Sequence, residues 1–186
     1  MAHTAHLLLQ VLGYAVFLRP WLYWIPNSLP FLELGITEFE PDFPLYRLPS
    51  LASALVSDLL DRLSEINRVR IHHAAKLARA LAEHPDFRTP KPAQESQPIY
   101  IRFPVIARDK VTRDRVLARL RAVGIGASAF YPSAICDIAG IEKYMVQNEF
   151  HRPRAEDLAR RLFTLPTHPF VGQADLDRII EAVRAM

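Results

Sequence analysis

The sequence predicts an α+β fold in which a long helix precedes a small sheet with helices on one face. Apolar residues recur at helical spacings of three and four between residues 51 and 84. Beyond residue 98, short apolar runs alternate with amphipathic stretches, as in a small layered unit. With 186 residues, 50% of them hydrophobic, the chain is long enough to bury a core.

Residues 1–50 are predicted to form an N-terminal apolar helix and a proline-rich connector. The run 7–18 is mostly apolar, and prolines recur from residue 20 to residue 49. The run is too short to span a bilayer, which needs roughly 20 apolar residues. It also lacks the basic start and cleavage site of a signal peptide. A core or interface helix is favoured, and a helix resting on a membrane surface is the alternative.

Residues 51–84 are predicted to form one long linking helix, with Ser50 as its N-cap. Its apolar stripe is expected to pack against a partner and contains Ala52, Val56, Leu59, Leu63 and Ile66. The opposite face is expected to be solvated or ion-paired. That face contains Asp58, Asp61, Arg62, Glu65, Arg68, Arg70 and Arg79.

Residues 85–98 contain several prolines and little to bury, which predicts a surface linker or hinge before a third part, residues 98–186. In this part the expected strands are 99–106, 127–131 and 162–165. The expected helices are 112–123, which Gly124 ends, then 154–161 and 173–185. The last helix should turn Leu176, Ile179, Ile180 and Val183 inward.

Charge and composition argue against several classes of function. The 23 basic residues are interspersed with 20 acidic ones, so the net charge of +3 does not indicate a nucleic-acid partner. The basic stretch 108–121 is interpreted as a solvated helix face, because Val116 and Leu120 mark a buried side. The single Cys136 excludes an internal disulfide and suits a reducing compartment, here the cytoplasm; it is predicted to be a small buried side chain.

No metal or phosphate motif is found. None of the seven histidines has ligand spacing, and the adjacent His72 and His73 point about 100° apart on a helix. The six glycines do not cluster as a phosphate loop requires. Gly124 and Gly126 are better explained by a helix C-cap and a tight strand entry.

Several strings resemble the pyridoxal-phosphate-dependent sugar aminotransferases of the DegT/StrS type. They are FPLYRLPSLASALVSDLLDRLSEINRVR, PIYIRFPVI, RAVGIGASAFYPS and LARRLFTLPTHPFVGQADLDRIIEAVR, which occur in the family's order. The resemblance covers about residues 42–186 and implies the C-terminal small domain of a fold type I aminotransferase. The segment FLRPWLYWIPNSLPFL is similar to an insertion in members linked to exopolysaccharide synthesis.

In that family the resemblance implies a lysine bonded to pyridoxal phosphate, an aspartate and a stacked aromatic residue, all in a larger N-terminal domain. That domain has no counterpart in this sequence. The four lysines are expected mid-helix, in the linker and on polar surfaces: Lys76, Lys91, Lys110 and Lys143. No catalytic residue and no cofactor contact is therefore predicted in this chain alone.

The resemblance also suggests one contact to substrate or phosphate, at Tyr46 and Arg47. These residues are similar to the last two of the family's Asn-Tyr-Arg motif, in which the asparagine reaches the cofactor phosphate of a neighbouring subunit. Leu45 replaces that asparagine and cannot donate a hydrogen bond. Arg47 can still bind an anion, or it pairs with a carboxylate.

Two further segments depart from the family. The family's YPxPLH string is similar to residues 131–136, but Ala134 and Cys136 replace the second proline and the histidine. His168 lies in a similar proline-flanked segment and is interpreted as a structural turn residue.

The leading hypothesis is the C-terminal portion of a nucleotide-sugar aminotransferase of polysaccharide biosynthesis, inactive alone. Its partner is expected to be a large-domain chain or further copies of itself. The alternative is a non-catalytic dimerisation or docking module derived from the same family.

Overall fold

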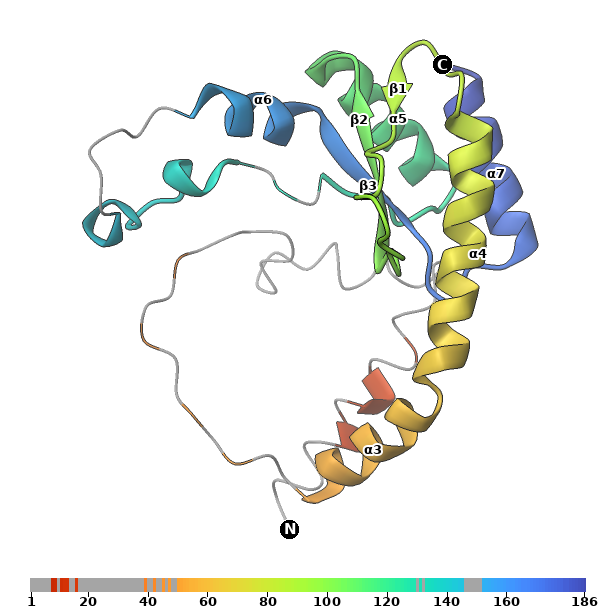
Figure 1. Ribbon diagram of the computed structural model, residues 1–186, viewed down its shortest axis with the longest axis vertical. Coiled ribbons are helices and arrows are strands. Elements are labelled where there is room, and N and C mark those ends of the chain that lie inside the picture. The colour runs from red at the N-terminus through yellow and green to blue at the C-terminus, as the bar shows by residue number, and fades with distance from the viewer. Residues whose placement is uncertain are drawn as a thin grey trace.

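The computed structural model describes residues 8, 9, 11–13, 16, 39, 42, 45, 47, 50–129, 131, 133–145 and 152–186 (Figure 1). The α-helices are α3 (Ser50–Asp61), α4 (Leu63–Leu81), α5 (Lys110–Ala122), α6 (Pro153–Arg161) and α7 (Gln173–Arg184). The strands are β1 (Phe87–Arg88), β2 (Arg102–Ala107) and β3 (Leu162–Pro166), and two short 3-10 helices span Ile135–Asp137 and Glu142–Tyr144. The predicted α+β class is confirmed.

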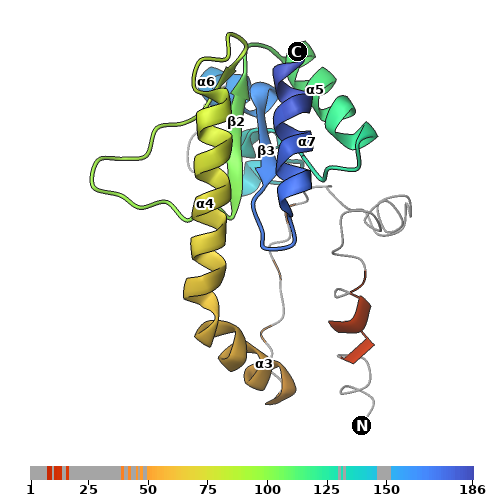
Figure 2. The same cartoon turned by 90° about the vertical axis from the view of Figure 1, so that its right-hand side faces the viewer.

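The three strands form an antiparallel sheet in the order β1-β2-β3. Side chains alternate along β2, so Phe103, Val105 and Ala107 point to one face and are buried there. The same hydrophobic cluster contains residues of α4, α5 and α7, which therefore cover that face of the sheet (Figure 2). The expected arrangement of a small sheet with helices on one face is thus observed.

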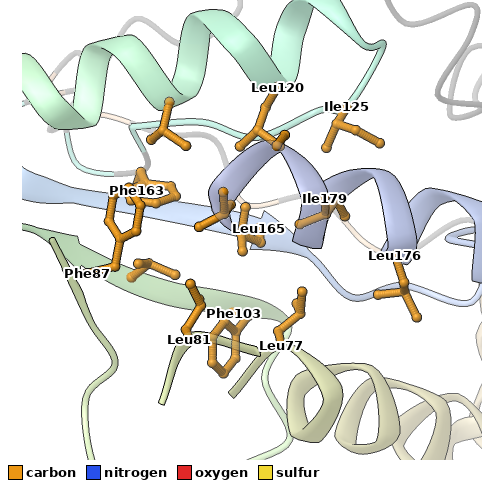
Figure 3. Packing of buried hydrophobic residues seen from close by; sticks show 14 of the residues in the cluster. Leu77, Leu81, Phe87, Phe103, Leu120, Ile125, Phe163, Leu165, Leu176 and Ile179 are labelled. Carbon is orange, nitrogen blue, oxygen red and sulfur yellow. The ribbon is translucent and has the colours of Figure 1, made fainter. Parts of the chain in front are cut away.

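The core lies between the sheet and these helices (Figure 3). Phe163 of β3 is fully buried, and its ring meets the edge of Phe87 with the centroids 5.7 Å apart. Leu77 and Leu81 enter the core from α4, so the C-terminal half of that helix shares one core with the residues after 98. Each such side chain contributes roughly 1.5–3 kcal/mol to the stability of the fold.

Local capping explains where α5 begins and ends. The Asp109 carboxylate accepts a hydrogen bond from the Thr112 N–H at 2.7 Å and caps the first turn. This bond, followed by hydrogen bonds from the Thr112 and Arg108 side chains, lowers the pKa of Asp109 to about 2. Gly124 follows the helix with φ +76°, a conformation that favours glycine, which confirms the predicted helix end.

The prediction of a surface linker at residues 85–98 is wrong at Phe87. This residue is 2% exposed and forms β1, which pairs with β2 through Phe87 and Ala107. A two-residue strand is too short to show the alternation by which strands are predicted. Residues 90–97 are all exposed, as the linker prediction expects.

The strand predicted at 127–131 is reduced to an isolated bridge between Ser128 and Thr164. The Ser128 N–H donates to the Thr164 carbonyl at 3.2 Å, and the Thr164 N–H donates to the Ser128 carbonyl at 2.8 Å. Tyr131 is exposed, so the chain has left the sheet by that point. The strand predicted from residue 99 begins at Arg102, because Tyr100 has a positive φ of 56° that interrupts extended backbone.

The long helix predicted over 51–84 is two helices, with a turn at Arg62 between α3 and α4. The expected N-terminal helix is described only at Leu8, Leu9, Val11, Leu12, Gly13 and Val16, which are helical. The rest of that prediction lies outside the described residues. No helix in the described part of the chain is long and apolar enough to cross a membrane.

Candidate functional site

All four lysines are described, and none is buried. Lys76 donates to the Gln173 side chain at 2.5 Å, and Lys110 forms an ion pair with Asp114 at 2.5 Å. Lys143 lies 5.7 Å from the centre of the Tyr144 ring, and Lys91 is exposed. A lysine nucleophile needs a desolvated setting that lowers its pKa. These four residues do not fit the role of the lysine that bonds to pyridoxal phosphate.

The predicted anion contact is only partly described. Arg47 is exposed, and no ion pair joins it to another described residue. Leu45, in the place of the family's asparagine, is 89% exposed. Tyr46 lies outside the described residues. The contact of Tyr46 and Arg47 with substrate or phosphate stays a prediction.

Cys136 is half-buried, whereas the sequence predicts a small buried side chain. Its 3-10 turn lies beside α6, where the ligand atoms of Cys136, Asp137 and Glu156 come within 4.8 Å of one another. Both carboxylates already serve the backbone: Asp137 accepts the Ala134 N–H at 3.2 Å, and Glu156 accepts the Arg152 N–H at 3.1 Å. This cluster is therefore explained by capping.

The two adjacent histidines differ in environment. His72 is exposed, whereas His73 is buried and its Nδ1 lies 3.1 Å from the Thr167 carbonyl oxygen. Burial lowers the pKa of His73, so the ring is neutral near pH 7 and can donate from Nδ1. The hydrogen bond between His73 and Thr167 joins α4 to the segment that follows β3.

Three basic side chains lie near this hydrogen bond. Arg70 of α4, Arg102 of β2 and His168 after β3 are each half-buried. Arg102 donates from Nε to the Thr164 hydroxyl at 2.7 Å and from Nη2 to the Gly126 carbonyl at 2.7 Å. Burial first, and then the positive charges of Arg102 and Arg70, lower the pKa of His168.

Sequence reasoning misses this group, since it predicts Arg70 on a solvated or ion-paired face. A signal was present, however. Arg70 begins the row that continues through His73, Ala74, Leu77 and Leu81, all four of which are buried. An arginine at the head of a helical core stripe indicates a buried polar contact.

The exposed apolar surface of α3 is the second candidate. We call it the α3 apolar face and define it by Leu55, Val56, Leu59 and Leu60 of α3 together with Leu63, the first residue of α4. These side chains are between 37% and 61% exposed. Asp58 and Asp61 lie on the other side of the helix. Contiguous exposed apolar residues of this kind mark a surface that another element covers.

The small antiparallel sheet, covered on one face by α4, α5 and α7, matches the C-terminal part of a fold type I aminotransferase. A profile of the DegT/DnrJ/EryC1/StrS aminotransferase family matches residues 45–184. The chain therefore belongs to this family.

Solved structures agree with this assignment. S. venezuelae DesV, solved in complex with a ketimine intermediate, is 29% identical and superposes with a TM-score of 0.66 over 75% of this chain and 36% of its own. The aminotransferase TlmJ from Streptoalloteichus hindustanus is 25% identical, with a TM-score of 0.61 over 73% of this chain and 35% of its own.

Helicobacter pylori PseC, an aminotransferase involved in the biosynthesis of pseudoaminic acid, shares the fold. Its identity is 21% and its TM-score 0.63, over 81% of this chain and 40% of its own. The chain thus spans well under half the length of the structures that it matches.

Proposed function

We propose that this chain is the C-terminal portion of a pyridoxal-phosphate-dependent nucleotide-sugar aminotransferase, and that it does not transaminate alone. One observation carries the proposal: the family match covers residues 45–184, yet the chain spans only 36% of DesV. The remainder of such an enzyme is not among these 186 residues. Because the segment FLRPWLYWIPNSLPFL resembles an insertion in family members linked to exopolysaccharide synthesis, we propose that the reaction belongs to polysaccharide biosynthesis. The single cysteine suits the reducing cytoplasm.

The lysine environments support inactivity of the chain alone. When bound, pyridoxal phosphate stabilises a carbanion next to the amino nitrogen, and the protein holds it through a lysine amine. Lys76 and Lys110 are engaged with Gln173 and Asp114, and Lys91 and Lys143 are exposed. We assign no step of the reaction to any of them.

The partner that we favour is a lysine-bearing large domain on another chain, and the α3 apolar face is the surface that we propose for its docking. The face belongs mainly to α3, the first helix inside the residues that the family profile matches, and its apolar side chains are exposed in this chain. Residues 51–84 would then link the two parts of the enzyme. A further copy of this chain is the other candidate occupant.

Reconstitution tests the proposal. The full chain is mixed with the lysine-bearing large-domain fragment of a family member, pyridoxal phosphate, glutamate and a nucleotide ketosugar, and transfer of the amino group is measured. We expect turnover only when both polypeptides are present. Turnover by the chain without the fragment would contradict the proposal.

A pair of leucine variants locates the docking surface. Leu59→Glu places a charge in the α3 apolar face and should weaken binding of the large-domain fragment at least tenfold. Leu158→Glu is the matched control, because Leu158 is an exposed leucine on α6, away from α3. Equal effects of the two changes would remove α3 from the interface.

The second candidate function is a non-catalytic dimerisation or docking module. The same α3 apolar face favours it, because an exposed apolar helix also pairs with its own copy. Light scattering after size exclusion separates the two: a stable dimer that ignores the large-domain fragment supports the module. The gene next to the one that encodes this chain also separates the two candidates. A lysine-bearing large domain encoded there supports the split enzyme.

A further inference from the structure

Two buried side-chain atoms in the described part of the chain have no hydrogen-bond partner, and they lie in one region. They are Nε of Arg70 and Nδ1 of His168. A buried polar atom without a partner costs roughly 1–3 kcal/mol, so most folded proteins pair such groups. Two of them close together indicate a missing ligand group.

The contacts around His73 explain why the two residues meet. His73 Nδ1 lies 3.1 Å from the carbonyl oxygen of Thr167, the residue before His168. Arg70 is three residues before His73 on α4 and so lies on the same face of the helix, one turn closer to α3. The segment after β3 therefore lies against the middle of α4, and Figure 1 shows the end of β3 beside that helix.

Charge in this region is mainly positive. Arg102, which pairs with Pro166 in the sheet register, contributes a second guanidinium close to His168. The carboxylate that acts on His168 is Asp175, and both its oxygens are engaged: Oδ2 accepts the Gly172 N–H at 2.9 Å, and Oδ1 accepts from Arg178. Arg70 forms no ion pair with any described residue.

The geometry points to a binding site for an oxyanion group of a small molecule, a carboxylate or a phosphate, between Arg70 and His168. An arginine binds such groups through two parallel N–H bonds, and its Nε is one of the two donors when the anion lies along the Nε edge. Arg70 is only half-buried, so a rotation of its flexible side chain brings Nε to the ligand. His168 supplies the second donor from its ring. The site does not depend on the aminotransferase activity proposed above.

Histidine NMR on the full chain tests this site, with succinate and inorganic phosphate as separate probes. We expect one of them to shift the His168 ring signal in a saturable manner and to raise the pKa of His168, because a bound negative charge favours the imidazolium. The signal is assigned by its loss in His168→Gln. The probe with the lower dissociation constant identifies the ligand as a carboxylate or a phosphate.

Arginine variants provide the decisive comparison. Arg70→Gln should raise the dissociation constant at least tenfold, and Arg70→Lys, which keeps the charge but loses the planar fork, should raise it by a smaller factor. Arg79→Gln is the matched control, an exposed arginine on the same helix. If Arg70→Gln affects folding, Arg70→Lys still tests the site. The proposal is overturned if neither probe gives a saturable shift at concentrations up to about 20 mM, because a site that binds more weakly than this is not specific. It is also overturned if the Arg70 and Arg79 variants bind the probe with equal affinity.

Discussion

Two halves of one nearly continuous helical stretch behave differently. In α4, Leu77 and Leu81 are 1% and 4% exposed, because α7 and the sheet cover them. In α3, Leu59 and Leu60 are 56% and 61% exposed. Both helices are amphipathic, so amphipathic pattern alone does not determine burial. The difference shows that the sequence specifies which face of a helix is apolar but not which element covers that face.

The largest effect is expected in the core. Phe163→Ala removes a fully buried ring that packs against Phe87, and it should lower the free energy of unfolding by roughly 3–5 kcal/mol. Chemical denaturation followed by circular dichroism measures this loss. A loss below about 1 kcal/mol would show that the sheet and helices do not pack as described.

A pair of leucines tests the comparison between the helices directly. Leu77→Ala in α4 should cost roughly 2–5 kcal/mol, because the side chain is buried among core residues. Leu60→Ala in α3 should change the stability of the isolated chain by less than about 0.5 kcal/mol. Equal losses would mean that α3 is already covered within this chain.

The pH dependence of stability is a smaller effect. The folded pKa values of His73 and His168 lie below the ordinary 6.5, mainly because of burial. Below pH 6.5 the unfolded chain therefore binds protons that the folded chain does not, and stability falls as the pH decreases. Thermal unfolding between pH 7.5 and pH 5 should show this fall, and His168→Gln should reduce its slope. If His168→Gln leaves the slope of stability against pH unchanged, groups other than His168 cause the pH dependence.

The regular part of the fold was predictable from the sequence. The helix expected at 154–161 is α6, Pro153–Arg161, and the helix expected at 173–185 is α7, Gln173–Arg184. The apolar residues of both segments recur at helical spacing, and Pro153 suits the first turn of α6. Leu176, Ile179 and Val183 are buried as predicted, and Ile180 packs against the same core while partly exposed.

The irregular part was not predictable, for physical reasons that differ between residues. Phe87 is buried through a strand of two residues, which leaves no pattern to detect. Ser128 forms a single bridge, so an apparent strand became a loop. The break at Arg62 follows from no proline or glycine, and the sequence offers no reason for it.

The candidate sites divide in the same way. Three residues of the predicted apolar stripe, Val56, Leu59 and Leu63, belong to the α3 apolar face, because amphipathicity is a local property. That a partner covers this stripe stays a prediction. The meeting of Arg70 with His168 depends on the packing of α4 against the end of β3, which no local pattern encodes. The two residues are 98 positions apart in the sequence, so residue spacing could not predict their contact.

The most direct test of the central claim is borohydride trapping of pyridoxal phosphate on the purified chain, followed by mass spectrometry of its lysine-containing peptides. The account predicts no stoichiometric adduct at Lys76, Lys91, Lys110 or Lys143, since none lies in a buried pocket. In the presence of the large-domain fragment, the adduct should form on the fragment's lysine. A stable, stoichiometric adduct at one lysine of this chain alone would contradict the account.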